Sequence, residues 1–229
     1  MKISEKKTKS MIINYTNNYQ FSTRLSLNNM NIEVVDKMKI LGTIITDKLI
    51  WNENCNELIS KINKRMLLLK KILSFGATIE EMVHLWIIYC RSALEKCAAV
   101  WSSSLSQQNK DDLERTQKVF AKLVLKKEYN DENENAYENA LLKLNLQSLE
   151  QRRKEVCLNF AKNGIKNNTL TDLFPPKISN HLMEKRYEDK YEVFKANTDR
   201  MRNSSIIYMQ NLLNSDYKDE VIKDKQVKI

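Results

Sequence analysis

The sequence predicts an α+β fold that is mostly helical, with a small antiparallel β portion ahead of a helical bundle. Up to Trp51 the apolar residues come in short runs rich in Val, Ile and Thr and separated by Asn, which is typical of strands and turns. After Trp51 they recur every three or four positions, which is the period of a helix face. Only three glycines and two prolines occur in 229 residues, so little interrupts long helices.

The β portion is expected to end in the stretch Lys37–Trp51, which Gly42 interrupts. Short strands are predicted at residues 10–15, 24–27, 32–35, 39–46 and 49–51. Asn28–Asn31 would form a hairpin turn, because Asn tolerates the left-handed backbone that tight turns require. Strands this short cannot close a core by themselves.

The helical portion is expected to contain helices over residues 53–73, 79–99, 111–125, 136–144, 149–164 and 203–214. Thr78-x-x-Glu81 has the spacing of a capping box, and Ser148-x-x-Gln151 gives a similar start signal. In the first helix, Ile62 and Leu69 belong to an apolar face. A different face carries four basic residues, Lys61, Lys64, Arg65 and Lys71.

These elements predict four consecutive parts. They are partial strands with a hairpin (residues 1–51), a helical domain (52–165), a helical extension (166–214) and a disordered tail (215–229). The tail is predicted to be disordered because its charges are balanced and its apolar content is low.

Positive charge is concentrated near the N-terminus. The formal net charge is +9, and residues 1–72 hold 13 Lys and Arg against 6 Asp and Glu. Such an excess can attract a polyanion such as a nucleic acid. A solvated surface rich in lysine is the alternative interpretation, and charge alone does not choose between the two.

Several classes of enzyme site are excluded by residue type and spacing. Three isolated glycines cannot form a phosphate-binding loop. His84 lies within an apolar helix, which favours a structural role over catalysis. Asp111 and Asp112 fall in the first turn of a predicted helix, where they complement the helix dipole rather than hold a metal.

The cysteines and the apolar runs indicate an intracellular protein of a reducing compartment, whether nuclear or cytoplasmic. The four cysteines have no CxxC spacing, so we expect free, mostly buried thiols and no metal site. The first nine residues are charged where a secretory signal would be apolar. The run over residues 79–99 contains six charged or titratable side chains and is a poor membrane span.

A set of short sequence words follows one order over about residues 3 to 214. They are Lys7–Met11, Ile32–Val35, Lys39–Gly42, Leu49–Trp51, Leu113–Lys118, Leu149–Arg153, Cys157–Lys162, Leu173–Pro175, Ala196–Arg200 and Tyr208–Leu213. Together these words and their spacing resemble the reverse transcriptases of non-LTR retrotransposons, the jockey-like group in particular. The chain is then similar to the last palm strands, the primer-grip hairpin and the thumb of such an enzyme, followed by the start of its C-terminal region.

The resemblance implies an RNA-directed DNA polymerase, but not an active one in this chain. In the family, palm aspartates hold two magnesium ions, and two of these aspartates lie in a Tyr-x-Asp-Asp turn upstream of the segment that matches Lys7. This sequence contains no Tyr-x-Asp-Asp. We therefore assign it no catalytic residue, no metal site and no cofactor, and Lys7 becomes vestigial.

The same resemblance implies which residues would hold nucleic acid. Lys39 and Gly42 match the hairpin that steadies the primer end, where glycine allows close approach of a backbone. Without the resemblance, Gly42 is better interpreted as a turn or bulge glycine. The helix over residues 53–73 matches the first thumb helix. Its basic face of Lys61, Lys64, Arg65 and Lys71 is then a phosphate track, with a solvated helix face as the alternative.

The expected function is that of a truncated remnant of a transposable-element reverse transcriptase, with at most non-specific binding of RNA or DNA. The alternative is an element-derived helical protein that has no nucleic-acid role and acts, if at all, through protein contacts. A third interpretation is that the polypeptide is a fragment of an intact polymerase gene. Neither a membrane nor a small-molecule substrate is expected as a partner, and the oligomeric state is open.

Overall fold

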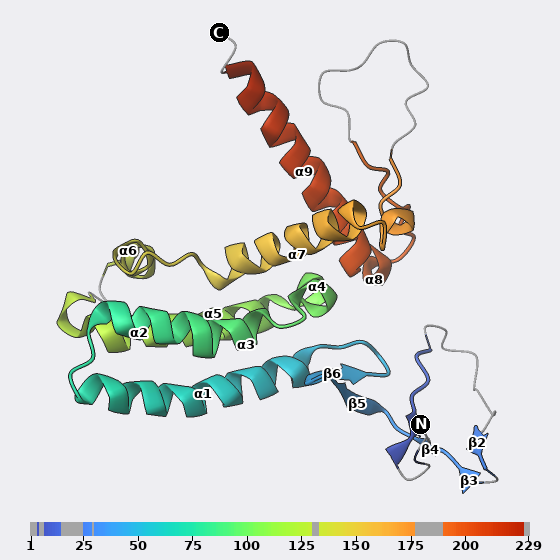
Figure 1. The fold of residues 1–229 in the computed structure, drawn as a ribbon, viewed down its shortest axis with the longest axis horizontal. Helices are drawn as coiled ribbons and strands as arrows, with labels where there is room; N and C mark the ends of the chain where they lie inside the picture. The colour runs from blue at the N-terminus through green and yellow to red at the C-terminus, as the bar shows by residue number, and fades with distance from the viewer. Residues whose placement is uncertain are drawn as a thin grey trace. The chain divides into compact units, whose positions relative to one another are not determined.

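The computed structural model describes residues 4, 7–14, 25–28, 30–129, 133–176 and 190–226. Figure 1 shows their helices and strands. The chain forms two compact units, Met1–Leu58 (unit 1) and Ile59–Ile229 (unit 2). The division lies within the first long helix, α1 (Asn52–Ser74), rather than before it as expected. The predicted parts 52–165 and 166–214 fall largely within one unit. The α+β, mostly helical fold class is confirmed.

The described strands of unit 1 form three separate pairs. β1 (Lys9–Ser10) runs parallel to β4 (Glu33–Val34), while β2 (Ser26–Leu27) with β3 (Met30–Asn31) and β5 (Lys37–Ile40) with β6 (Thr43–Thr46) are antiparallel. The parallel pair departs from the expected antiparallel arrangement. The hairpin at Asn28 is tighter than predicted, and Asn28 has the expected left-handed backbone, with φ of 50°.

Three strand predictions were wrong in extent. The strand predicted over residues 39–46 is a hairpin instead, in which Leu41 and Gly42 separate β5 from β6. The strand predicted over residues 10–15 is limited to Lys9–Ser10 among the described residues, and Tyr15 lies outside them. Residues 49–51 form no strand, because Leu49 adopts a left-handed backbone with φ of 49°. The Thr46 hydroxyl accepts a hydrogen bond from the Ile50 amide at 3.0 Å and closes this turn locally.

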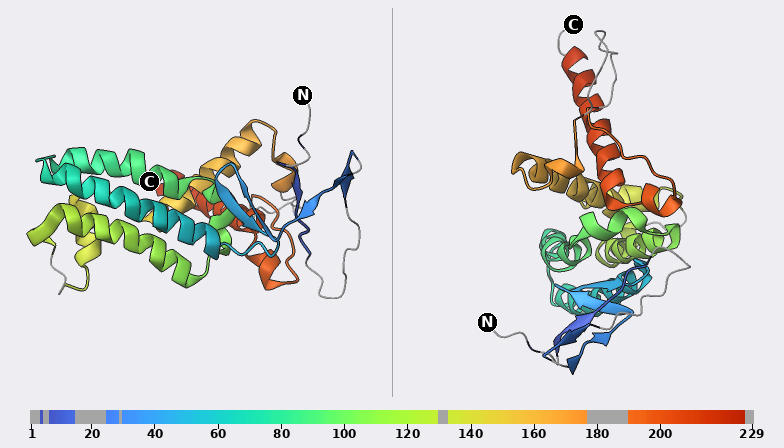
Figure 2. Two further views of the ribbon diagram at one scale, coloured as in Figure 1. Left: turned by 90° about the horizontal axis from the view of Figure 1, so that it is seen from below. Right: turned by 90° about the vertical axis from the view of Figure 1, so that its right-hand side faces the viewer.

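Unit 2 consists of helices. They are the remainder of α1, α2 (Ile79–Leu85), η2 (Trp86–Arg91), α3 (Ser92–Glu95), α4 (Ala98–Trp101), η3 (Ser102–Ser104), α5 (Gln107–Leu125), η4 (Lys126–Glu128), α6 (Ala136–Lys143), α7 (Leu149–Lys166), η5 (Thr171–Leu173), α8 (Asp199–Arg202) and α9 (Ser205–Gln226). Figures 1 and 2 show α1 antiparallel to the α2–η2–α3 run, with α5 beside them.

Side-chain caps fix several helix starts. The capping box at Thr78 is confirmed, with both of its hydrogen bonds formed to Glu81. Ser148 caps α7 by accepting from the Gln151 amide at 3.2 Å. Ser106 caps α5 in the same way, so this helix begins at Gln107, four residues before the predicted start.

The helix predicted over residues 79–99 is interrupted once, at Lys96–Cys97, and contains a π-helical segment before that point. Its middle, η2, has π-helical hydrogen bonding, and Cys97 adopts a left-handed backbone with φ of 54° that separates α3 from α4. The Trp101 indole donates to the Lys96 carbonyl at 2.9 Å. This bond satisfies a backbone acceptor next to the break, where helical hydrogen bonding stops.

Two groups of buried side chains make up the interior of unit 2. Trp86 of η2 stacks on Phe120 of α5 with ring centroids 4.6 Å apart. A second cluster joins α4, α7, the segment after η5 and α9 through Ala99, Cys157, Ala161, Phe174, Met209 and Leu213. Cys55, Cys90 and Cys157 are buried and Cys97 is exposed, which confirms free, mostly buried thiols.

The predicted disorder after residue 214 was wrong for residues 215–226, which continue α9. Contacts hold this part of the helix. Lys162 of α7 forms an ion pair with Asp216 at 2.6 Å, and the Lys190 ammonium lies 5.3 Å from the Tyr217 ring centroid. Low apolar content therefore did not prevent helix formation, because polar side chains supply these contacts.

Candidate nucleic-acid interface

The candidate interface is a stripe of side chains along the part of α1 that belongs to unit 2. Residues three or four positions apart lie above one another on a helix. The α1 stripe consists of Lys61, Lys64, Leu68, Lys71 and Phe75. The buried residues Ile62 and Leu69 face the other way, into the protein. In Figures 1 and 2 the other helices of unit 2 lie on one side of α1, and the side chains of the α1 stripe are exposed.

The three lysines of the α1 stripe have no partner among the residues that the structure describes. All are exposed, and within the described ranges none of them forms an ion pair or a side-chain hydrogen bond. At 1.5 Å per residue, Lys61 and Lys71 are about 15 Å apart along the helix axis. Three unneutralised ammonium groups in one line can contact successive phosphates of a nucleic-acid backbone.

Arg65 is engaged inside unit 2 and does not belong to the stripe. Its guanidinium donates a hydrogen bond to the Tyr89 carbonyl and lies 4.4 Å from the centroid of the Tyr89 ring. The two contacts attach α1 to η2, because a cation over an aromatic face is attracted by the ring. Of the four basic residues predicted on this helix, three are therefore available and one is structural.

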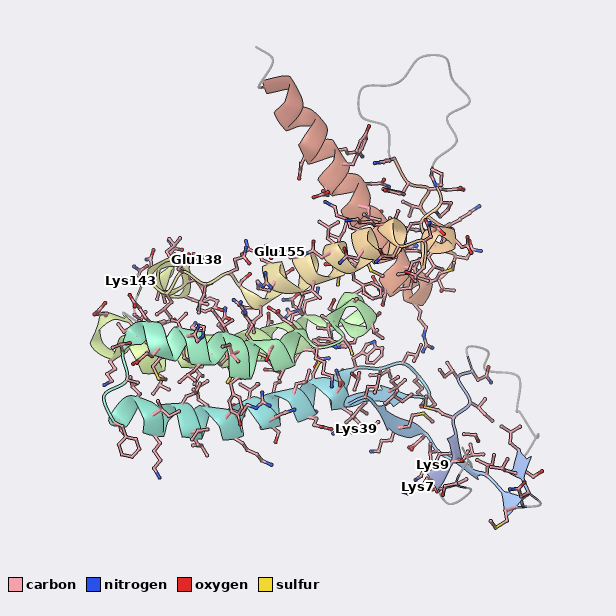
Figure 3. The ribbon with its side chains drawn as sticks, in the orientation of Figure 1. Lys7, Lys9, Lys39, Glu138, Lys143 and Glu155 are labelled. Atoms are coloured by element: carbon pink, nitrogen blue, oxygen red, sulfur yellow. The ribbon has the colours of Figure 1, made fainter. Side chains whose placement is uncertain are left out.

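The lysines of the hairpin are neutralised. Lys39 forms an ion pair with Glu57, and Lys37 forms one with Glu53 at 3.0 Å, both glutamates lying in the first turns of α1. The hydrogen bond donated to Glu53 raises the pKa of Lys37 above its usual value. Figure 3 shows Lys39 beside the start of α1. The structure therefore places Lys39 in a structural contact of unit 1.

Gly42 occupies the hairpin tip, as predicted. Leu41 and Gly42 are the two residues between β5 and β6, with φ of 48° and 87°. Positive φ at both positions characterises the type I′ turn, whose twist suits a two-residue hairpin. This requirement accounts for Gly42 without a ligand. Leu41 has an unfavourable backbone for a leucine, and its side chain is 83% exposed.

Lys7 lies just before β1 and is exposed. Its neighbour Lys9 pairs with Glu33 across the β1–β4 pair at 3.3 Å. Figure 3 shows both residues near β1, apart from Lys39. The structure therefore does not gather Lys7, Lys39 and Gly42 into one cluster around a common ligand.

A buried polar network holds the helices around Gln117 of α5. Its amide oxygen accepts from the Trp86 indole at 3.2 Å, and its amide nitrogen donates to the Gln147 carbonyl at 2.9 Å and to the Tyr137 hydroxyl at 3.1 Å. Tyr137 in turn donates to Glu114, and burial together with that carboxylate raises the pKa of Tyr137. Glu114 also accepts from the amide of Leu149 at 3.0 Å, at the start of α7.

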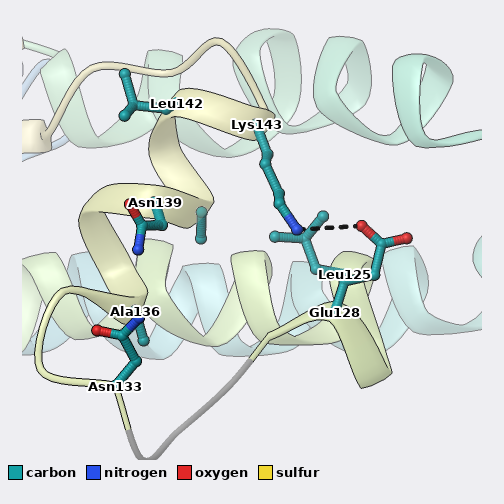
Figure 4. A pocket seen from close by; sticks show the side chains of 8 residues that line it. Leu125, Glu128, Asn133, Ala136, Asn139, Leu142 and Lys143 are labelled. Carbon is teal, nitrogen blue, oxygen red and sulfur yellow. Dashed lines mark hydrogen bonds and ion pairs between the residues drawn. The ribbon is translucent and has the colours of Figure 1, made fainter.

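A shallow hollow of about 400 Å³ lies beside α6 (Figure 4). It is lined by Leu125, Glu128, Asn133, Ala136, Asn139, Ala140, Leu142 and Lys143. Lys143 pairs with Glu128 across it at 3.4 Å. Its charged groups satisfy one another, so the hollow has no unpaired charge to select a ligand.

A metal site and a membrane-spanning helix are both absent from the described residues. No group of three or more His, Cys, Asp or Glu side chains in those ranges is arranged to hold a metal ion. Burial raises the pKa of the Cys90 thiol to about 11, so it is protonated at neutral pH. No helix in the same ranges has the length and apolar character needed to cross a membrane.

Sequence reasoning missed the apolar members of the stripe. Leu68 and Phe75 are exposed, although leucine and phenylalanine are usually counted toward a core. A signal existed, because Leu68 and Phe75 continue the three-and-four spacing of Lys61, Lys64 and Lys71.

The chain has no significant match among protein-family models, curated proteins or solved structures.

Proposed function

We propose that this chain binds RNA or DNA without sequence preference through the lysines of the α1 stripe and does not itself polymerise nucleotides. The observation that carries the proposal is the alignment of Lys61, Lys64 and Lys71 on one face of α1. All three are exposed and have no partner in the described part of the chain. Contacts of lysine with phosphate supply affinity that is independent of sequence.

The resemblance to the thumb region of a non-LTR retrotransposon reverse transcriptase supports this proposal. The stripe lies on the helix that matches the first thumb helix, and this helix follows a β-hairpin whose tip is Leu41–Gly42. Binding rather than catalysis is proposed because the sequence contains no Tyr-x-Asp-Asp.

The test measures the affinity of the full chain for a fluorescent 20-nucleotide oligonucleotide over a series of salt concentrations. The variant Lys61→Gln/Lys64→Gln/Lys71→Gln is expected to bind about tenfold more weakly or worse at 50 mM salt, and the slope of log affinity against log salt should fall by about 2, since each lost phosphate contact removes about 0.7.

A matched variant controls for net charge. Lys118, Lys166 and Lys195 are exposed lysines on other parts of unit 2, and their replacement by Gln changes the net charge equally. This control should keep nearly the wild-type affinity and slope. Equal loss in both variants would refute the assignment to α1. Absence of salt-sensitive binding by the wild type would refute the function and favour an element-derived protein that acts through protein contacts.

A further inference from the structure

The α1 stripe ends in an aromatic ring that the fold leaves in solvent. Phe75 is 79% exposed, and Leu67, about two helical turns earlier, is 71% exposed. The Phe75 amide still donates to the Ile72 carbonyl at 3.0 Å, so Phe75 continues the last turn of α1. Gly76, with φ of 95°, then turns the chain away, and no atom lies within 4 Å of where a Cβ on Gly76 would be.

Two kinds of chemistry therefore lie next to each other on one helix face. The lysines favour an anion, whereas Phe75 and Leu68 favour a flat or apolar group. Phosphate alone would pair with the lysines but would leave the apolar side chains without a partner. A second copy of the same face would bring lysines against lysines, which is unfavourable. An unpaired nucleotide offers both an anion and a flat aromatic group, because it joins a charged phosphate to an aromatic base.

We propose that the ligand of the α1 stripe is single-stranded nucleic acid, with Phe75 stacking on an unpaired base while Lys61, Lys64 and Lys71 contact the phosphates. This inference rests on the proposed function and narrows its substrate. The stripe of about 15 Å from Lys61 to Lys71 spans roughly four nucleotides at about 3.4 Å each along one strand. In a duplex the base faces are already stacked on neighbouring bases, so Phe75 would have no partner there.

The test compares the full chain with the variants Phe75→Ala and Phe75→Trp. The probes are a fluorescent oligothymidine of 20 nucleotides and a 20-base-pair DNA duplex, both at 50 mM salt. Phe160 on α7 is also an exposed phenylalanine, and Phe160→Ala is the matched control. Circular dichroism should show unchanged helix content in every variant, because neither ring is buried.

Phe75→Ala is expected to weaken binding to the single strand about tenfold, as expected for loss of one stacked base. Its salt slope should stay unchanged, because no phosphate contact is lost. Phe75→Trp should retain the affinity, and its added indole fluorescence should be quenched on binding. Phe160→Ala should bind like the wild type, and the wild type should prefer the single strand to the duplex.

The outcomes separate this inference from the proposed function. One contradicting outcome is that the triple lysine variant loses binding but Phe75→Ala does not. Another is that Phe75→Ala weakens single-strand and duplex binding equally. In either case the stacking inference is wrong and the phosphate-binding function stands. If the wild type binds neither probe, both are wrong. Binding to vesicles of anionic phospholipid in place of the oligonucleotide would also overturn the inference.

Discussion

The lysines of the hairpin and the lysines of the α1 stripe contribute the same charge to the sequence but differ in their surroundings. Lys37 and Lys39 face Glu53 and Glu57 and are neutralised inside unit 1. The stripe lysines of unit 2 have no such partner among the described residues. Both groups are exposed to solvent, so exposure does not distinguish them.

The difference shows that a basic excess in a sequence overstates the charge available to a ligand. Glu53 and Glu57 are one turn apart on α1 and pair with the two lysines of β5. The later turns of α1 carry the stripe lysines, which have no such carboxylate partner among the described residues. Nucleic-acid binding should therefore depend on the α1 stripe and much less on the hairpin.

The largest expected effect is on the stability of unit 2, which carries the α1 stripe. Gln117→Leu would leave the Trp86 indole without its partner in the interior and would remove the part-buried bonds to the Gln147 carbonyl and the Tyr137 hydroxyl. We expect a loss of about 3 kcal/mol in the free energy of unfolding, because each buried orphan costs about 1–3 kcal/mol. Urea denaturation measures this loss, and Gln108→Leu on the exposed side of α5 should cost less than about 0.5 kcal/mol. Equal losses of unfolding free energy in the two variants would show that the Gln117 network does not stabilise the fold.

Reversing the charge of the stripe should have the next largest effect. Lys61→Glu/Lys64→Glu/Lys71→Glu replaces attraction to phosphate with repulsion, and we expect affinity for an oligonucleotide to fall about a hundredfold at 50 mM salt. Fluorescence anisotropy measures the affinity. The thermal midpoint should change little, since the replaced ammonium groups form no ion pair or hydrogen bond within the described part of the chain. Unchanged affinity of this variant would show that the α1 stripe does not bind the oligonucleotide.

Freeing the hairpin lysines should have a smaller effect in the opposite direction. Glu53→Gln/Glu57→Gln removes the carboxylates that neutralise Lys37 and Lys39, and affinity should rise by a factor of about 3 through two new contacts with phosphate. Glu134→Gln/Glu192→Gln makes the same change in net charge on exposed sites of unit 2. A comparable rise in that control would show a general charge effect instead.

Removing the hairpin lysines themselves should have the smallest effect on binding. Lys37→Gln/Lys39→Gln is expected to change affinity less than twofold and to lower the thermal midpoint slightly. The pKa of Lys37 is raised by Glu53 from its ordinary 10.5, so the pair stabilises the fold below that pH and loses its effect as the pH rises through the higher folded value. The difference in midpoint between wild type and variant should therefore disappear in strongly alkaline solution.

Much of the helical fold could be predicted from local signals. The Thr78 and Ser148 caps and the three-and-four spacing after Trp51 identified helices within a few residues, because these signals act over one or two turns. The break at Cys97 and the extension of α9 beyond Asn214 were not predicted. The break is a left-handed backbone at a non-glycine residue, which no local signal marks, and the extension is accompanied by contacts between distant residues, such as Lys162 with Asp216.

The candidate site was predicted in part for the same reason. Helix periodicity located Lys61, Lys64 and Lys71 on one face without knowledge of the rest of the fold. It could not show that Arg65 contacts Tyr89, or that Lys39 pairs with Glu57, since these partners are set by tertiary structure. Phe75 was given no role, because spacing along the sequence does not show whether an apolar side chain is exposed.

Lysine footprinting tests the central claim most directly, because it compares both groups of lysines within one molecule. The protein is acetylated briefly with and without an excess of the 20-nucleotide oligothymidine, and modification of each lysine is read by mass spectrometry. We predict that Lys61, Lys64 and Lys71 become several-fold less reactive on binding, while Lys37 and Lys39 react equally in both samples. Protection of the hairpin lysines with unchanged reactivity along α1 would contradict the account.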